Sequence, residues 1–274
     1  MIRIIAARHC GNNFLRKEEI EVKKQKIPLI IAAVFFTVFE GLMFYFIHID
    51  RPDTEINLYY ACIIGAAVFS SLTLILDLIE AKATDKSAGE VIFSLRNGNL
   101  IRIAMLFTLV ADYYLVALKP PIHLAGVSVF LGTQLFICLH ILANDSDKRA
   151  GIIHIAIRLI ATAIIVAVCY ATLGEGADAL AIISVVYYGN LCVNALFAHR
   201  SGRGGVILTV GLILFALCDI NVGLARLNDM YVGGFPEGSL PYELLHTDLD
   251  LVWIFYIPSQ TLIPLSLLRT SNSK

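Results

Sequence analysis

Two aspartates stand inside apolar stretches that are long enough to lie within a membrane. Asp219 belongs to "FALCDINVGLARL" and Asp112 belongs to "LVADYYLVAL". A carboxylate near the centre of a bilayer costs several kcal/mol, so such groups usually face a cavity or a polar partner. Two carboxyls that meet in a dry site can divide acid–base work, because one retains a proton while the other stays charged beside a developing cation. Asp112 and Asp219 are therefore the candidate catalytic residues.

Uncharged polar side chains in the other apolar stretches are candidate substrate contacts. These candidates are Gln134, Tyr187, Asn194, Tyr256 and Gln260. Tyr256 and Gln260 stand at positions i and i+4 and share one helix face. Amides and tyrosines inside membrane helices also tie neighbouring helices together, so for each amide a binding role and a tethering role remain open. Glu40, in the first apolar stretch, is a weaker candidate for a third acid.

Several other classes of site are not expected. The seven histidines fall near the ends of the apolar stretches or in loops, and neither HxxxH nor HExxH occurs, so no zinc site is predicted. The same placement leaves no buried histidine for a Ser–His–Asp arrangement. The six cysteines lack metal-type spacing and imply no disulfides. A net charge of -1 without a basic aromatic patch gives no reason to expect a nucleic-acid partner.

The composition predicts the elements that must position these residues. The chain has 274 residues, of which 58% are hydrophobic and 16% charged, and its mean hydropathy is +0.76. Soluble domains are about 45–50% apolar and about 25% charged. We predict an all-α, polytopic membrane bundle of eight transmembrane helices, since roughly 20 apolar residues cross the hydrocarbon core. The predicted spans are 28–48, 57–79, 101–118, 122–143, 152–172, 178–198, 205–226 and 250–268.

The positions of the basic residues predict the orientation of the bundle. With the N-terminus inside, all 21 Lys and Arg fall on the inner side except Arg51, Lys119 and Arg226, and the positive-inside rule then places both termini in the cytoplasm. We expect a basic cytoplasmic arm at 1–27, the transmembrane domain at 28–268 and a short tail at 269–274. The charged segment 80–100 is expected to lie on the inner leaflet as an amphipathic helix.

A faint internal repeat relates the two halves of the chain. The third and seventh spans each carry an aspartate, and each is followed by a span with one central glutamine, in "GVSVFLGTQLFICLH" and "LVWIFYIPSQTLIPLS". Four helices followed by four in the same orientation fit this pattern. A repeat built around intramembrane acids is also typical of small-solute or proton-coupled transporters, which is the rival interpretation.

From about residue 100 to residue 268 the sequence resembles the YhhN family of lysoplasmalogenases. The resemblance rests on the aspartates of the third and seventh spans, on "GVSVFLGTQLF", on a tyrosine in the sixth span and on "VWIFYIPSQTLIPLS". It implies an integral membrane hydrolase that uses no metal and no organic cofactor. Its expected partners are a lysophospholipid substrate and the surrounding membrane lipids. Such an enzyme cleaves the sn-1 vinyl ether bond of lysoplasmalogens to a fatty aldehyde and a glycerophospho-alcohol. The cytoplasmic membrane of a bacterium is the expected location.

The resemblance carries specific roles onto this sequence. Asp112 and Asp219 match the family's two acids, and Tyr187, Tyr256 and Gln260 match its polar positions. Gln134 stands where many members have histidine, so a catalytically inactive lipid-binding relative is a third interpretation. Arg102 and Arg200 are possible phosphate contacts by position, although each is expected first as a positive-inside anchor.

Overall fold

The computed structural model describes residues 30–47, 54–83, 88–145, 147–202, 204–230 and 234–268. Within these ranges every regular element is a helix, which confirms the predicted all-α class. The predicted basic arm at 1–27 and the tail at 269–274 lie outside the described residues.

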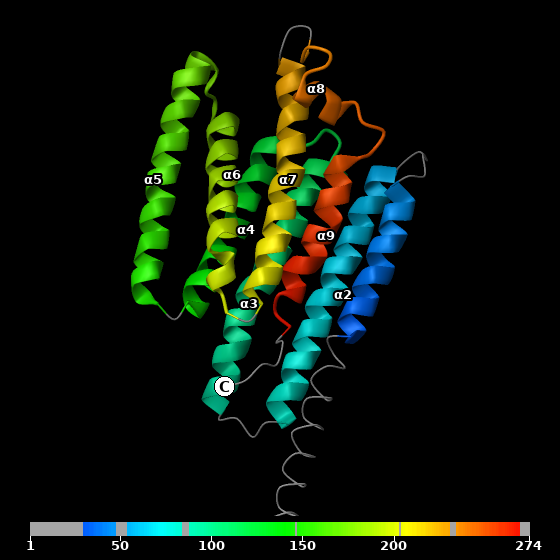
Figure 1. Cartoon of the computed structure of the whole chain (residues 1–274), viewed down its shortest axis with the longest axis vertical. Coiled ribbons are helices and arrows are strands. Elements are labelled where there is room, and N and C mark those ends of the chain that lie inside the picture. Colours follow the sequence, from blue (N-terminus) through cyan, green and yellow to red (C-terminus); the bar gives the residue numbers. More distant parts are fainter. Residues whose placement is uncertain are drawn as a thin grey trace, which may run out of the picture.

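Long helices lie roughly side by side along one axis (Figure 1). The first is Ile30–Ile47. In chain order it is followed by α2 (Thr54–Ala83), α3 (Ala88–Asp112), the π-helix η1 (Tyr113–Ala117), α4 (His123–Asn144), α5 (Lys148–Leu173), the short helix η2 (Gly174–Gly176), α6 (Ala179–Phe197), the short helix η3 (Ala198–Arg200), α7 (Gly205–Met230), α8 (Leu240–Leu245) and α9 (Leu251–Leu265). In Figure 1 α5 forms one edge of the bundle, and α9 lies between α7 and α2. We call the end that carries α8 the α8 end and the opposite one, with the α4–α5 and α6–α7 turns, the Arg200 end.

Seven of the described helices are long and apolar enough to cross a membrane, and they correspond to the first seven predicted spans. The chain is therefore a multi-pass helical membrane protein. The helix found within the predicted eighth span, 250–268, is shorter than the other seven, because α9 has only 15 residues. At about 1.5 Å per residue it is roughly 22 Å long, less than the hydrocarbon thickness of about 30 Å. Most of its side chains are buried, so α9 forms part of the interior of the bundle.

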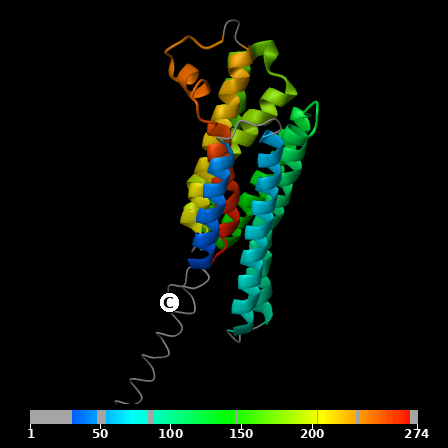
Figure 2. The ribbon, with the colours of Figure 1, turned by 90° about the vertical axis from the view of Figure 1, so that its right-hand side faces the viewer.

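The predicted interfacial helix at 80–100 is wrong, because α2 continues to Ala83 and α3 already begins at Ala88. Figure 2 shows α2 and α3 extending together beyond the other helices at the Arg200 end. The apolar part of α3 begins at Asn97, four residues earlier than predicted. Asp112 consequently lies about 22 Å along it by helix rise, past its midpoint and nearer the α8 end.

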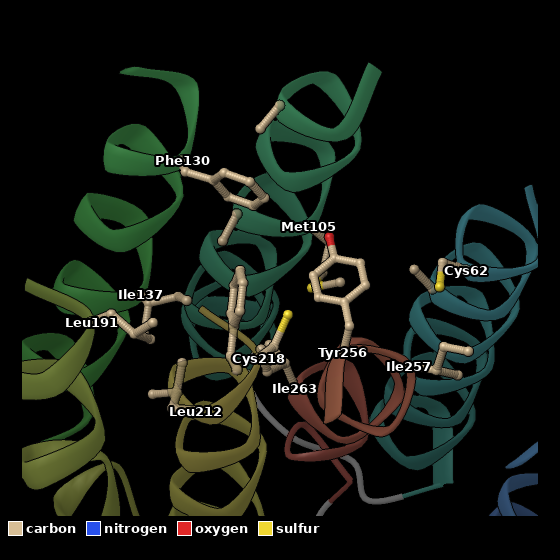
Figure 3. Close-up of a cluster of buried hydrophobic side chains, with 14 of the residues drawn as sticks. Cys62, Met105, Phe130, Ile137, Leu191, Leu212, Cys218, Tyr256, Ile257 and Ile263 are labelled. Carbon is tan, nitrogen blue, oxygen red and sulfur yellow. The ribbon is translucent and has the colours of Figure 1, made fainter. Parts of the chain in front are cut away.

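The apolar surface of the bundle faces outward as well as inward. On α5 only Ala150, His154 and Cys169 are buried, whereas Ile152 and Leu159 are 68% and 66% exposed. Large contiguous apolar surfaces are rare on soluble monomers, but a lipid environment solvates them. The interior is a separate apolar cluster contributed mainly by α2, α3, α4, α6, α7 and α9, part of which is drawn in Figure 3.

A glycine brings α7 and α9 close together in this interior. A Cβ atom on Gly211 would lie 3.1 Å from Ile263 Cγ1 and 3.3 Å from both Ile263 N and Leu262 Cβ. Small residues at helix interfaces permit such approaches in membrane proteins. Gly223, farther along α7, has no neighbouring atom within 4 Å of the same position. The two glycines therefore differ in whether a side chain fits.

We expect Gly211→Val to destabilise the bundle by about 1–3 kcal/mol, because the added carbons would force α9 away from α7. Gly223→Val, on the same helix with open space beside it, is the matched control and should leave the unfolding temperature close to that of the unmodified protein. Thermal unfolding of the full chain in detergent measures both. Equal unfolding temperatures for the two variants would contradict the close packing of α7 on α9.

Candidate active site

Asp112 is buried at the point where α3 changes its helical form. The residue is 5% exposed, and the π-helix η1 begins at the residue that follows it. A π-helical turn is wider than an α-helical turn and often occurs at functional sites. The phenol of Tyr256, on α9, donates a hydrogen bond to Oδ2 of Asp112. This bond joins two residues that are 144 positions apart in the chain.

Asp219 makes the same kind of contact with a different helix. It is half-buried in the middle part of α7. The hydroxyl of Tyr187, on α6, donates to Oδ2 of Asp219 over 2.5 Å. Tyr187 itself is buried. Each aspartate therefore accepts a hydrogen bond from one tyrosine, and a phenol that donates to a carboxylate stabilises the charge that burial disfavours.

A row of aromatic rings connects the two aspartate–tyrosine pairs. Tyr187 stacks on Phe130 at a centroid distance of 5.5 Å, and Phe130 meets Phe215 edge-on at 5.5 Å. Phe215 in turn meets Tyr256 edge-on at 5.6 Å. Figure 3 shows Phe130 of α4 and Tyr256 of α9 reaching into the same part of the interior. The two pairs thus belong to one buried cluster, to which α3, α4, α6, α7 and α9 all contribute.

The two carboxyls are held by separate partners. Asp112 and Asp219 bind the tyrosines at the two ends of the row of rings, Tyr256 and Tyr187. Among the described residues no hydrogen bond joins them, since each is held by its own tyrosine. The two acids could therefore act together only if one substrate molecule contacted both of them.

The candidate amides do not gather around the aspartates. Gln134 of α4 and Asn194 of α6 bind each other, with Asn194 Nδ2 donating to Gln134 Oε1 over 2.9 Å and to the Gln134 carbonyl over 2.8 Å. Gln260 of α9 donates to Ser259 Oγ over 3.1 Å, while its own Oε1 has no partner. Of the five residues expected to bind substrate, Tyr187 and Tyr256 hydrogen-bond to the candidate catalytic acids, and the three amides have other hydrogen-bond partners.

Glu40, expected as a weaker third acid, lies apart from both pairs. Thr261 Oγ1 of α9 donates to Glu40 Oε1 over 2.7 Å, which ties the helix Ile30–Ile47 to α9. Among the described residues no cluster of three or more His, Cys, Asp or Glu side chains is arranged to hold a metal ion.

One polar residue of this region was missed as a functional candidate by sequence reasoning. Arg158 was counted among the cytoplasmic anchors, but it lies within the apolar span of α5. Its guanidinium donates to Oδ1 of Asn190 and of Asn194 on α6. Two i, i+4 pairs in the sequence indicate this cluster, His154 with Arg158 and Asn190 with Asn194. Residues at this spacing share one helix face, so the pairs predict two polar faces that can pack together.

The YhhN family model matches residues 93–267. The chain belongs to the YhhN family. The matched segment contains both aspartates, their tyrosine partners and the amides, whereas Glu40 lies before it. No curated protein and no solved structure matches the chain.

We expect Tyr256→Phe to lower the free energy of unfolding by about 1–3 kcal/mol, because it leaves the buried Asp112 carboxyl without its donor. Tyr170→Phe is the matched control, since Tyr170 is 52% exposed on α5. Both are compared by thermal unfolding in detergent. If Tyr256→Phe unfolded at the temperature of the control, the phenol–carboxyl bond would not support the bundle.

Proposed function

We propose that the chain is an integral membrane hydrolase of the lysoplasmalogenase type. It would cleave the sn-1 vinyl ether bond of lysoplasmalogens to a fatty aldehyde and a glycerophospho-alcohol. Membership in the YhhN family supports this proposal. The observation that carries it is the pair of interior acids, buried Asp112 and half-buried Asp219, each held by a tyrosine of one aromatic cluster.

The proposed reaction begins with transfer of a proton from one aspartic acid to the alkene carbon that is β to the ether oxygen. The alkene π electrons form the new C–H bond, and an oxocarbenium ion results. The second aspartate, as a carboxylate, stabilises this cation, by the division of labour known for carboxyl pairs in glycosidases. Water adds to the cationic carbon and returns a proton to the first aspartate. The hemiacetal hydroxyl then gives up its proton, and its O–H electrons form the C=O bond of the aldehyde while the C–O bond to glycerol breaks. The glycerol oxygen leaves with the electron pair of that bond and takes up one proton, so that no net proton is gained or lost.

The tyrosines and phenylalanines would prepare this chemistry without taking part in bond breaking. Tyr256 and Tyr187 fix one oxygen of each carboxyl, which leaves the second oxygen of each for the substrate or for water. Apolar surroundings strengthen the interaction between the carboxylate and the cation, because little solvent screens it. Phe130 and Phe215 provide an apolar surface for the alkenyl chain.

The proposal includes a topology with eight spans and both termini in the cytoplasm. The short α9 would be the eighth span. The proposal also includes the internal 4+4 repeat, in which Phe130 of α4 corresponds to Tyr256 of α9 and Gln134 corresponds to Gln260. All four residues are buried, which supports this correspondence. The two aromatic members point into the same part of the interior (Figure 3). The cytoplasmic membrane of a bacterium is the proposed location, and the Arg200 end is the proposed cytoplasmic side.

A transporter is the second candidate function, and one observation favours it. Pro258 and Pro264 lie inside α9, where each removes a backbone donor, and interrupted helices are typical of transporters. Uptake of a solute into vesicles, driven by a pH difference and without aldehyde release, would support this function. Binding of a lysophospholipid without either activity would indicate an inactive lipid-binding relative.

We expect Asp112→Asn and Asp219→Asn each to reduce aldehyde release from a lysoplasmalogen by about 100-fold or more, the typical contribution of a general acid or base. An amide can neither donate a proton of comparable acidity nor balance the cation. Asp229→Asn is the matched control, because Asp229 is an exposed acid on α7, the helix that carries Asp219.

All three variants are assayed as purified full chains in lipid vesicles, with the aldehyde quantified by mass spectrometry and folding checked by thermal unfolding. Full activity in either of the first two variants would rule out the paired-acid mechanism. A comparable loss in Asp229→Asn would show that the assay reports a general effect of removing charge.

A further inference from the structure

A second polar cluster lies between α4, α5 and α6, on the Arg200 side of the Tyr187–Asp219 pair. Arg158 is half-buried at its centre. Besides its bonds to Asn190 and Asn194, its Nη2 donates to His154 Nε2 over 3.1 Å. Because a guanidinium only donates, His154 accepts here and must be neutral, with its proton on Nδ1. All the hydrogen-bond partners of Arg158 are therefore uncharged.

The charge of Arg158 has no counter-ion among the described residues. At this end of the bundle the carboxylate of Asp145 accepts a hydrogen bond from Arg200 Nε over 2.7 Å. The Arg200 guanidinium holds the pKa of the Asp145 carboxyl below its usual value, so this carboxylate is already engaged. An unneutralised guanidinium within a membrane span is costly and usually serves a ligand.

The unused hydrogen-bonding capacity of the cluster consists of donors. Arg158 Nε and Gln134 Nε2 are both buried and have no hydrogen-bond partner. Gln134 is 0% exposed, and its Oε1 is already occupied by Asn194. A positive charge together with two unpartnered N–H groups selects an anion with several acceptor oxygens, which is the chemistry of a phosphate group.

The spacing along α6 relates this cluster to the candidate active site. Tyr187, which holds Asp219, is followed on the same helix by Asn190 and Asn194, which hold Arg158. Helix rise puts Asn190 about 4.5 Å and Asn194 about 10 Å from Tyr187 along the axis. In a lysophospholipid the three-carbon glycerol backbone separates the phosphate from the sn-1 ether oxygen, which is a span of comparable length.

We propose that Arg158 and Gln134 bind a phosphate group, and that the headgroup of a lysophospholipid supplies it. This inference rests on the proposed function, since it assigns the polar end of the same substrate. The phosphate would lie on the Arg200 side and the ether oxygen at the aspartates. The alkenyl chain would continue along the aromatic cluster. Asn190, Asn194 and His154 are positioning residues, because they hold the guanidinium.

The test is equilibrium binding to the purified full chain in detergent, with ligands that the proposed reaction does not consume. The first probe is a saturated 1-O-alkyl lysophosphoethanolamine, the second is the corresponding 1-O-alkylglycerol without phosphate, and the third is inorganic phosphate as a competitor. The variants are Arg158→Gln, Arg158→Lys and Gln134→Glu, the last of which keeps the size of Gln134 but repels an anion. Arg149→Gln, an exposed arginine near the start of α5, is the matched control.

We expect Arg158→Gln and Gln134→Glu to weaken binding of the phosphate-bearing lipid by about tenfold or more and to leave binding of the alkylglycerol unchanged. Arg158→Lys should bind more tightly than Arg158→Gln, because it keeps the charge. Displacement of the lipid by inorganic phosphate from the unmodified chain but not from Arg158→Gln would support the phosphate site and would show that the site also binds the free anion. Unchanged binding in all three variants, or an equal loss for both lipids, would overturn the proposal and leave a tether between α5 and α6.

The result is separable from that for the proposed function. Binding of the saturated ether lipid that depends on Arg158, without aldehyde release from a lysoplasmalogen, would refute only the hydrolase. Aldehyde release at the normal rate in Arg158→Gln and Gln134→Glu would refute only the phosphate site.

Discussion

The hydrogen bond between a tyrosine phenol and a buried aspartate is the interaction on which this bundle depends. A carboxyl group cannot remain in an apolar interior without a partner, and here the partner always comes from another helix. Tyr256 fastens α9 to the end of α3, and Tyr187 fastens α6 to α7. The acids that are proposed to act on substrate therefore also fix which helices are neighbours. Stability and the geometry of the candidate site follow from the same two contacts.

The interior of α6 links two kinds of polar chemistry. Tyr187 contacts an acid, whereas Asn190 and Asn194, one and two turns farther along, contact a cation. The Phe130 ring stacks on Tyr187, and Gln134, one turn farther along α4, binds Asn194. The uncharged side chains of α4 and α6 thus lie between an acid of α7, beside the aromatic rings, and a cation of α5. The proposed lysophospholipid, with a phosphate at one end and an apolar chain at the other, would match this order of regions.

Much of the fold follows from apolar run lengths, and the deviations have physical causes. Seven spans are predicted because each needs a run of about 20 apolar residues. The ends of α2 and α3 are mispredicted because both helices continue beyond their apolar parts into charged segments, where hydropathy carries no signal. The length of α9 is overestimated because a buried interior helix and a short membrane span have the same composition.

The aspartates can be found from the sequence, since an isolated acid in an apolar run is expensive enough to require a reason. Their partners cannot, because spacing along one helix gives the face of a residue but not the helix that it meets. The positive-inside rule counts Arg158 with the cytoplasmic residues, and its partners, which lie 32 and 36 residues away on α6, are seen only in the packed bundle. Gln134 is a candidate from the sequence, but its bond to Asn194, which also binds Arg158, depends on packing.

The most direct measurement is aldehyde release by the purified, unmodified chain in lipid vesicles, with a lysoplasmalogen and its saturated ether analogue compared in D₂O. Protonation of the alkene carbon predicts aldehyde from the vinyl ether alone, in proportion to the amount of protein, with one solvent deuterium on the carbon next to the carbonyl group. Aldehyde at the level of protein-free vesicles, or cleavage of the saturated ether at a similar rate, would contradict the account.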